Sequence, residues 1–411
     1  MMIKVIGAGL AGCEAAWQLA NRGIELELYE MKPSKKSPAH KSDLFAELVC
    51  SNSLRSDRLQ NAVGLLKEEM RLLGSLIMEA ADKTRVPAGG ALAVDRLDFS
   101  KYITKKIKNH PNIRVISDEI TEFPESPAII ATGPLTSDKL SQAIEKTGLF
   151  EQLHFYDAAA PIIEKDSLNM DRIFRASRYE RGDDYLNCPM NEEEYYNFVD
   201  NLIAAETVDI KDFEEKSVFE GCMPVESMAK RGRQTLAFGP LKPVGLVDPK
   251  TQKQPFAVVQ LRQDDAIDSM YNIVGFQTRL KFPEQKRVFG LIPGLENAEF
   301  VRFGVMHRNT FINGTKALND NFEVKNTKGL YFAGQISGVE GYVESAASGL
   351  LAGLSLAREI EGKPRLSFGG KTAIGALARY VSTPNSHFQP MNIGFGLMDN
   401  LDERVRSKQQ R

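Results

Sequence analysis

The chain has 411 residues, of which 42% are hydrophobic and 26% are charged, and its formal net charge is −2 at pH 7. These values are typical of a globular protein of roughly two or three domains and exclude a largely disordered chain. The small net charge supplies no overall field that would attract nucleic acid, so only a local basic patch could do so.

The cysteines are widely spaced and form no C-x-x-C pair; they are Cys13, Cys50, Cys188 and Cys222. This spacing indicates neither a zinc site nor a disulfide scaffold, and free thiols fit a reducing compartment. The N-terminus does not resemble a signal peptide, and no apolar run reaches the roughly 20 residues that a membrane helix needs. We therefore expect a cytoplasmic protein without a membrane segment or a metal site.

The first 30 residues predict a strand, a helix and a second strand. Residues 2–6 form a short apolar run, residues 10–20 are rich in small side chains, and residues 24–29 are again strand-like. Asn-Arg-Gly at 21–23 marks the end of the helix. A βαβ unit therefore opens the chain.

Further strands and one long helix are predicted before residue 135. Residues 63–80 repeat apolar side chains at steps of three and four, which predicts a single amphipathic helix that packs on a sheet. Residues 112–116 and 128–131 are strand-like. These elements can extend the N-terminal βαβ unit.

The middle of the chain, roughly residues 166–326, combines strand-like stretches such as 257–261 with charged helices such as 192–203, without repeats. After it, residues 329–333 predict a strand, and residues 344–360 predict a helix of small residues that can approach a sheet closely. The last strand and helix could therefore return to the N-terminal unit.

Residues 7–12 read Gly-Ala-Gly-Leu-Ala-Gly, a G-x-G-x-x-G motif between the first strand and the first helix. The first glycine makes the tight turn, the second admits a pyrophosphate, and the third lets the helix pack on the strand. Glu30 ends the next strand, near the position of a ribose-binding acid. We assign dinucleotide binding, rather than a chance glycine turn, to Gly7, Ala8, Gly9, Leu10, Ala11, Gly12 and Glu30.

Two later segments favour FAD over NAD as the dinucleotide. Residues 129–133 (Ile-Ile-Ala-Thr-Gly) resemble a motif of FAD-dependent reductases. Residues 332–335 (Phe-Ala-Gly-Gln) resemble their C-terminal flavin-contacting strand, with glutamine where aspartate is common. The expected further FAD contacts are Thr132, Gly133, Gly334 and Gln335. No second G-x-G-x-x-G marks a nicotinamide site.

The order of these segments predicts an α/β fold with a discontinuous FAD-binding domain. Residues 1–165 and 325–411 would form a Rossmann-like, glutathione-reductase-like domain. Residues 166–324 would form a mixed α+β insertion domain.

Long runs across nearly the whole chain are more specific than the glycine motif. They lie at 5–12, 45–55 (Phe-Ala-Glu-Leu-Val-Cys-Ser-Asn-Ser-Leu-Arg), 86–96 (Val-Pro-Ala-Gly-Gly-Ala-Leu-Ala-Val-Asp-Arg), 155–161, 219–224 (Phe-Glu-Gly-Cys-Met-Pro), 304–313 and 338–345. In these runs the chain resembles the TrmFO family of folate- and FAD-dependent tRNA (uracil-5-)-methyltransferases. It departs from the family at residues 407–411, where a longer helical tail is expected.

The resemblance implies an enzyme that forms 5-methyluridine in the T-loop of tRNA. Methylenetetrahydrofolate would give its one-carbon unit to reduced FAD, which would pass it to C5 of the uracil, and NADPH or NADH would supply the electrons. A related enzyme acts on ribosomal RNA, which therefore stays open as the substrate.

The resemblance also places Cys50 and Cys222 at the reaction centre. A uracil becomes nucleophilic at C5 when a thiolate adds at C6, so one cysteine would be the nucleophile. The other would assist proton removal or hold the flavin intermediate. The Gly-Cys-Met-Pro loop favours Cys222 as the nucleophile, but the order stays open. Residues 51–53 (Ser-Asn-Ser) look like caps of a following helix, whose dipole would stabilise a Cys50 thiolate. Cys13 and Cys188 are expected to be structural.

Other candidate residues have weaker support. The imidazole of His307 could stack on the pterin ring of folate, with Arg308 beside it, although a lone histidine is more often structural. Tyr342 could face the flavin or simply pack. A basic stripe could bind RNA phosphates or be a solvated face; it comprises Lys230, Arg231 and Arg233, with Arg279 and Lys281.

Two other functions stay open from the sequence. The glycine motif alone would equally support a plain flavin-dependent oxidoreductase of a small metabolite. A catalytically silent, flavin-bearing RNA-binding module is the second alternative. The oxidoreductase would not need Cys50 or Cys222, and methyl incorporation into RNA would separate the silent module from the enzyme.

Overall fold

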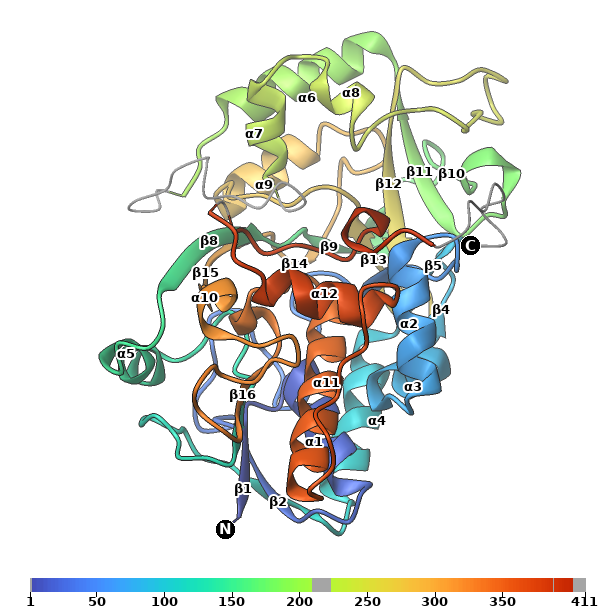
Figure 1. Cartoon of the computed structure of the whole chain (residues 1–411). Helices are drawn as coiled ribbons and strands as arrows, with labels where there is room; N and C mark the ends of the chain where they lie inside the picture. The colour runs from blue at the N-terminus through green and yellow to red at the C-terminus, as the bar shows by residue number, and fades with distance from the viewer. Residues whose placement is uncertain (1, 209–222, 387, 402–411) are drawn as a thin grey trace.

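The computed structural model describes residues 2–208, 223–386 and 388–401, with the backbone alone at 152–158, 307 and 308. Two parts lie one above the other in Figure 1. The lower part holds a five-stranded sheet, and the upper part holds a six-stranded sheet.

The five-stranded sheet has the order β16-β7-β1-β2-β6, and all its strands are parallel. The strands are β1 (Ile3–Ile6), β2 (Leu26–Tyr29), β6 (Ile113–Ile116), β7 (Ala128–Ile130) and β16 (Leu330–Phe332). Its central strands are apolar and buried because helices and loops cover both faces, as is usual for a parallel sheet. β16 comes from near the C-terminus, so the chain does return to its N-terminal unit, as expected.

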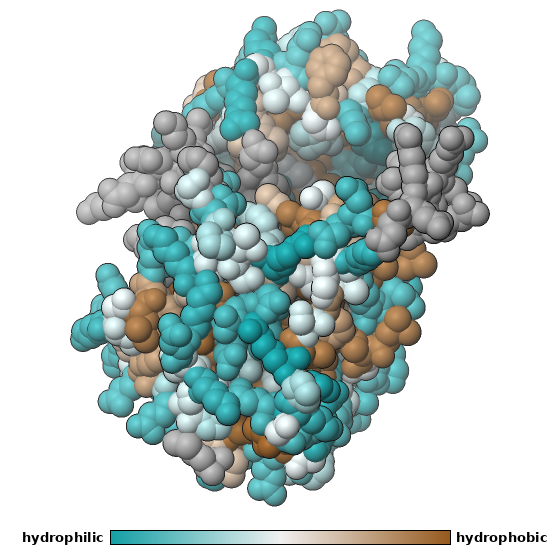
Figure 2. All heavy atoms as spheres, viewed as in Figure 1, coloured by the Kyte–Doolittle hydropathy of each residue, from teal (hydrophilic) through white to brown (hydrophobic). Residues whose placement is uncertain are grey.

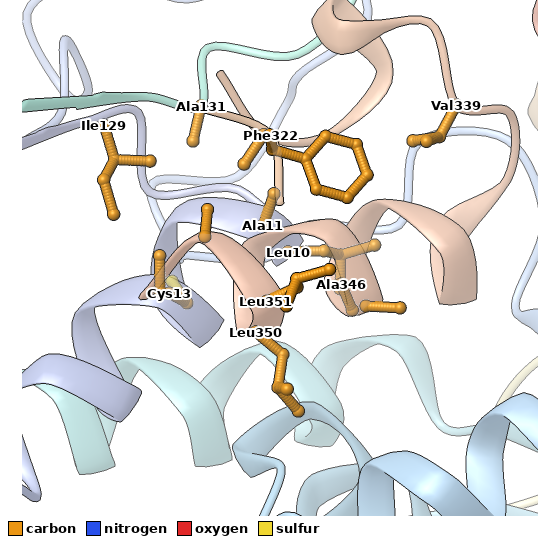
Figure 3. Close-up of a cluster of buried hydrophobic side chains, with 14 of the residues drawn as sticks. Leu10, Ala11, Cys13, Ile129, Ala131, Phe322, Val339, Ala346, Leu350 and Leu351 are labelled. Atoms are coloured by element: carbon orange, nitrogen blue, oxygen red, sulfur yellow. The ribbon is translucent and has the colours of Figure 1, made fainter. Parts of the chain in front are cut away.

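The helix α1 (Leu10–Ala20) packs along α11 (Tyr342–Ile360) at very short range. A Cβ atom added at Gly349 would lie 2.1 Å from the carbonyl oxygen of Ala11, and one added at Gly353 would lie 2.7 Å from that of Ala15. Figure 3 shows this contact; it labels Leu10, Ala11 and Cys13 on α1, Ala346, Leu350 and Leu351 on α11, and Ile129 and Ala131 beside them. The expectation of a small-residue helix suited to close packing is confirmed.

The single helix predicted over residues 63–80 is wrong, because the structure has two. These are α2 (Ala62–Leu72) and α3 (Leu76–Lys83). Gly74 between them has φ +72°, which ends α2, and the Ser75 hydroxyl accepts the amide hydrogen of Met78 and caps α3. The apolar periodicity passes through this break, which is why it suggested one helix.

The remaining elements of the lower part surround this frame. They are β3 (Ser53–Ser56), β4 (Arg85–Val86), β5 (Ala91–Val94), α4 (Arg96–Lys108), α5 (Asp138–Lys146), α10 (Gly314–Ala317), η5 (Gln335–Ser337), α12 (Ala373–Ser382) and η6 (Phe395–Leu397). Two longer strands pair antiparallel with each other, β8 (Gln152–Ala158) and β15 (Met306–Ile312). Figure 2 shows that hydrophilic side chains cover most of this face of the lower part.

The upper part has an antiparallel sheet with a core of its own. The strand order is β10 (Phe174–Arg175), β11 (Tyr185–Met190), β12 (Ala257–Gln263), β13 (Met270–Ile273), β9 (Ile162–Glu164) and β14 (Phe300–Arg302). The helices are η1 (Lys165–Ser167), η2 (Arg178–Glu180), α6 (Glu192–Ala204), α7 (Val225–Lys230), α8 (Thr235–Phe238) and α9 (Phe282–Phe289). Buried aromatic side chains such as Tyr195, Phe198 and Phe276 form the second core. None of the helices in the described ranges is long and apolar enough to cross a membrane.

The two parts are joined by polar contacts as well as by the chain. The Arg96 guanidinium on α4 makes two hydrogen bonds to the Asp264 carboxylate, at 2.9 and 3.2 Å. The Asn52 side chain donates to the carbonyl oxygens of Val94 and Gln263, at 3.0 and 2.9 Å. Residues next to Cys50 therefore lie where the lower and upper parts meet.

The α1–α11 contact generates a stability prediction. Gly349→Ala should lower the free energy of unfolding by about 1–3 kcal/mol, because its methyl group would collide with the Ala11 carbonyl and push the two helices apart. Urea unfolding followed by circular dichroism measures the change. Gly394→Ala is the control; since nothing lies within 4 Å of its Cβ position, the change there should stay within about 0.5 kcal/mol. Equal stability of the two variants would contradict the close contact.

Candidate functional site

A cavity opens at the carboxyl ends of the parallel strands, where ligands bind in open α/β sheets. It contains about 1120 Å³ of empty space, counting the part open to solvent. Its lining includes Gly7, Ala8, Gly9, Leu10, Ala11, Glu30, Thr132, Gly133, Gly334, Gln335 and Tyr342. The structure thus brings together every residue expected to contact FAD except Gly12, which lies behind the loop.

The glycine loop at residues 7–12 has the geometry that a pyrophosphate needs. Gly7 has φ +97°, and a Cβ atom there would lie 2.6 Å from the carbonyl oxygen of Ala131. Nothing lies within 4 Å of a Cβ atom at Gly9, so a ligand can approach the backbone there. A Cβ atom at Gly12 would lie 1.8 Å from the Gly7 carbonyl oxygen, so Gly12 serves packing. The first turn of α1 carries no acidic residue, which leaves its amide groups suited to an anion.

Glu30 lies at the same cavity, at the end of β2. One carboxylate oxygen accepts the Ala8 amide hydrogen at 2.9 Å, and the other accepts the Lys32 amide hydrogen at 3.0 Å. The side chain is buried, and each oxygen keeps a further lone pair for a ribose hydroxyl. Together with the open space at Gly9, this donor and acceptor set fits a dinucleotide.

The opposite wall comes from β7, β16 and the start of α11. The Thr132 hydroxyl lies 2.6 Å from that of Thr136, and the Gly334 amide donates to the Ser348 hydroxyl at 2.7 Å. The Gln335 side-chain amide donates to a Glu340 carboxylate oxygen at 2.6 Å. The Gln335 side chain is therefore held in place by a neighbouring acid.

Tyr342 connects this cavity to Cys50. Its hydroxyl oxygen accepts the amide hydrogens of Cys50 and Ser51, at 2.7 and 3.3 Å. Burial, followed by the nearby Cys50 sulfur, raises the pKa of Tyr342 well above its usual range, so the phenol stays neutral. Cys50 is partly buried, and its neighbour Val49 lines the cavity.

The predicted helix after Cys50 is wrong. Residues Ser53–Ser56 form strand β3, and the next helix begins only at Ala62. The Ser51 hydroxyl and the Asn52 side-chain oxygen accept from the Arg262 guanidinium instead, at 2.6 and 3.1 Å. Cys50 therefore does not precede the N-terminus of a following helix, and buried arginines lie near it instead.

These arginines were missed from the sequence. Arg96 donates to the Leu48 carbonyl oxygen, and its pKa is raised in part by nearby Asp264 and Cys50 although burial opposes this. Arg262 and Arg302 lie on β12 and β14, both 8% exposed. A buried arginine within an apolar strand, as in Ala257–Gln263, was the available signal.

Cys13 and Cys188 are both fully buried. Burial raises the pKa of both thiols far above the usual range. Cys13 also donates a hydrogen bond to the Ala8 carbonyl oxygen at 3.4 Å. Both are therefore unreactive thiols.

Three expected site residues either lie outside the described residues or are described by their backbone alone. Cys222 lies outside the described residues. The backbones of His307 and Arg308 lie in β15, opposite Asp157 and Tyr156 of β8, and their side chains are not described. Their contacts with folate stay a prediction.

The expected basic stripe is in part neutralised by acids. Arg233 hydrogen-bonds to Asp200 at 2.9 Å, Lys281 pairs with Glu206 at 2.6 Å, and Arg279 lies 3.8 Å from Glu226. Lys230 and Arg231, at the end of α7, are exposed and form no ion pair with the residues that the structure describes. They are the stronger candidates for phosphate contacts.

Within the described parts of the chain, no group of three or more His, Cys, Asp or Glu side chains is placed to hold a metal ion.

Comparisons with known proteins agree with this geometry. The family model of glucose inhibited division protein A matches residues 2–364. A Listeria monocytogenes methylenetetrahydrofolate–tRNA-(uracil-5-)-methyltransferase TrmFO is 61% identical over 411 residues, which is 100% of this chain and 95% of the relative. The protein of the same name from Acetivibrio thermocellus is 62% identical over 412 residues, 100% and 94% of the two chains.

Among solved structures, that of Aquifex aeolicus GidA matches with a TM-score of 0.72 and 16% identity, covering 95% of this chain and 68% of that one. At this identity the match bears on the fold alone. It agrees with the expected Rossmann-like FAD-binding fold.

The glycine loop generates a binding prediction. Gly9→Leu should weaken FAD binding at least about tenfold, or about 1.4 kcal/mol, because the side chain would fill the space through which the pyrophosphate approaches. Flavin fluorescence titration of the FAD-stripped protein measures this, and unfolding should be little changed. Gly12→Ala should behave in the opposite way and destabilise the fold, since its methyl group would overlap the Gly7 carbonyl. Unaltered FAD affinity in Gly9→Leu would contradict the site.

Proposed function

The chain belongs to the TrmFO family of methylenetetrahydrofolate–tRNA-(uracil-5-)-methyltransferases, and from this premise we propose how its residues carry out the reaction. The enzyme methylates C5 of a uracil in tRNA, takes the carbon from methylenetetrahydrofolate, and uses FAD. The observation that carries the proposal is the position of Cys50, held by Tyr342 against the wall of the dinucleotide cavity.

FAD would be held by the glycine loop at residues 7–12, by Glu30 and by the opposite wall. The α1 N-terminus and the open face of Gly9 suit the pyrophosphate, and Glu30 suits the ribose. Thr132, Gly133, Gly334 and Gln335 would contact the rest of the cofactor. When bound and reduced, the flavin supplies the one-carbon transfer and the electrons, which NADPH or NADH would restore.

The two cysteines would have different catalytic roles at the uracil, one as nucleophile and one as base. The Cys222 thiolate adds to C6, which makes C5 nucleophilic and able to accept the carbon unit. Cys50 then takes the C5 proton; the electron pair of the C5–H bond re-forms the C5–C6 double bond, and Cys222 leaves as a thiolate. The Tyr342 hydroxyl positions Cys50 by accepting the amide hydrogen of Cys50.

The two parts of the chain would contribute different functions. Residues 1–165 and 325–411 would form the FAD-binding domain, and residues 166–324 an insertion domain that meets the RNA. His307 and Arg308 would contact folate, and Lys230, Arg231 and Arg233 would contact phosphates. We take the T-loop of tRNA as the target and the cytoplasm as the site of action, with ribosomal RNA as the alternative substrate.

The cysteine roles predict a clear activity pattern. Cys50→Ala and Cys222→Ala should keep FAD but lose methylation by about 10² or more, as the loss of an essential nucleophile or base commonly does. Label transfer from methylenetetrahydrofolate to unmodified tRNA and ribosomal RNA, run in parallel, measures this and identifies the substrate. Cys188→Ala, at a buried thiol in the upper sheet, is the matched control. Normal methylation by both single variants would contradict the two-cysteine mechanism, whereas the absence of label transfer by the wild type would favour a plain flavin-dependent oxidoreductase.

RNA that carries 5-fluorouracil separates the two roles, because its C5 cannot release a proton. A covalent complex should accumulate with the wild type and with Cys50→Ala, and it should be absent with Cys222→Ala. The reverse pattern would exchange the two assignments.

The basic stripe predicts salt-dependent RNA binding. Changing Lys230 and Arg231 together to alanine should weaken binding and reduce the slope of log affinity against log salt by about 1.5, as the loss of two phosphate contacts would. Arg233→Ala should change the slope less, because Arg233 already pairs with Asp200. Filter binding at several salt concentrations measures the slopes. An unchanged slope in the double variant would make the stripe a solvated face.

A further inference from the structure

Three guanidinium groups surround the segment that carries Cys50. Arg96 from α4 donates to the Leu48 carbonyl oxygen, before the cysteine. Arg262 from β12 donates to Ser51 and Asn52, after it. Arg302 from β14 donates to the Ala39 carbonyl oxygen at 3.4 Å, in the adjoining loop. The cysteine backbone is therefore fixed from both sides by cations.

Two of these three guanidinium groups make no hydrogen bond to a carboxylate of the described residues. Arg96 is compensated by its two hydrogen bonds to Asp264. Among the described residues, Arg262 bonds only to neutral side chains, those of Ser51, Asn52 and Asn272. The Nε atom of Arg302 is buried and has no hydrogen-bond partner in the described parts of the chain. Since arginine stays protonated, both groups carry buried charge that is costly without an anion.

The acidic groups nearby do not supply that anion by direct contact. The Glu47 carboxylate acts on Arg302 electrostatically, but its oxygens accept the amide hydrogens of Lys41 and Ser42, at 3.1 to 3.3 Å. The Tyr342 phenol is kept neutral by burial. Burial lowers the pKa of both Arg262 and Arg302. Tyr185 and Asp264 oppose the shift at Arg262, Tyr342 opposes it at Arg302, and the nearby Cys50 sulfur opposes it at both. The sulfur is thus within electrostatic range of both uncompensated charges.

We propose that Cys50 is the anion that completes this cluster: Arg262 and Arg302 hold its sulfur as a thiolate at neutral pH and act as its positioning residues. The thiol proton passes to solvent when the protein folds. The thiolate is then ready to accept the C5 proton in the reaction proposed above. The catalytic consequence rests on that proposed function, but the ionisation of Cys50 does not.

The signs of the surrounding charges agree with a thiolate. Within the described parts of the chain, the groups that act on Cys50 include the three guanidinium groups and the neutral phenol of Tyr342. The charged or titratable groups described one step further out include Glu47, Asp264, Tyr185, His40 and Lys41. Asp264 is paired with Arg96, so Glu47 is the one uncancelled negative group in this described set. The net local charge therefore favours the ionised sulfur.

Alkylation of Cys50 as a function of pH tests the proposal without any methyl transfer. The FAD-loaded Cys222→Ala protein is treated with iodoacetamide between pH 5 and pH 10, and the Cys50 peptide is quantified by mass spectrometry. Cys13 and Cys188 are fully buried and do not compete. Only the thiolate reacts, so the rate should already be at its plateau at pH 7, with a midpoint well below the value of about 8.5 for a free cysteine.

Charge variants identify the cause. Arg302→Gln should move the midpoint upward by about one pH unit and slow alkylation at pH 7 about tenfold. Arg302→Lys keeps the charge and should stay close to the parent protein, which also covers the case in which the neutral variant folds poorly. Arg178→Gln is the control, because this partly buried arginine bonds to Gln260 and Val244 in the upper part.

Several outcomes would overturn the proposal. They are a parent midpoint at or above that of a free cysteine, an unreactive Cys50, or equal upward shifts in Arg302→Gln and Arg302→Lys. A low midpoint that depends on the Arg302 charge would support it, even if the protein failed to methylate RNA. Failure of this inference and failure of the proposed function are therefore distinguishable.

Discussion

The backbone contact between α1 and α11 is the constraint on which the site depends. Gly349 lets the Ala11 carbonyl approach to a distance that no side chain would permit. Because the N-termini of both helices face the same cavity, this contact fixes the phosphate-binding turn and Tyr342 relative to each other. Tyr342 in turn fixes the Cys50 amide. The close packing of α1 on α11 therefore helps to determine the position of the Cys50 thiol.

Elements with a local cause could be predicted from the sequence. The helix over residues 10–20 was predicted with the bounds it has, because a glycine motif precedes it and Gly23 follows it. The strands of the parallel sheet were found within one or two residues, since their apolar runs are short and uninterrupted. The break at Gly74 was missed because apolar spacing carries no information about a left-handed turn within the pattern.

The surroundings of Cys50 could not be predicted, because they depend on partners that are distant in sequence. Ser51 and Asn52 have the composition of a helix cap, and local rules give them that role. In the folded chain both side chains are bound by Arg262, about 210 residues away. A distant guanidinium engages these oxygens, and the chain continues as strand β3 in place of a helix. Only the family resemblance pointed to this cysteine.

The exposed and the buried basic residues of the upper part differ in whether acidic side chains pair with them. On the exposed side of the upper part, Arg233 and Lys281 are paired with acids, so much of their field is cancelled before any RNA arrives. Arg262 and Arg302 are buried at the junction of the two parts and lack such partners among the described residues. Burial of these two guanidinium groups is favourable only where the lower part provides an anion, and the lower part places Cys50 next to them. The proposed attraction between these two arginines and the Cys50 thiolate therefore both joins the upper part to the lower part and stabilises the thiolate. It concentrates positive charge near the reaction centre of a chain whose net charge is −2.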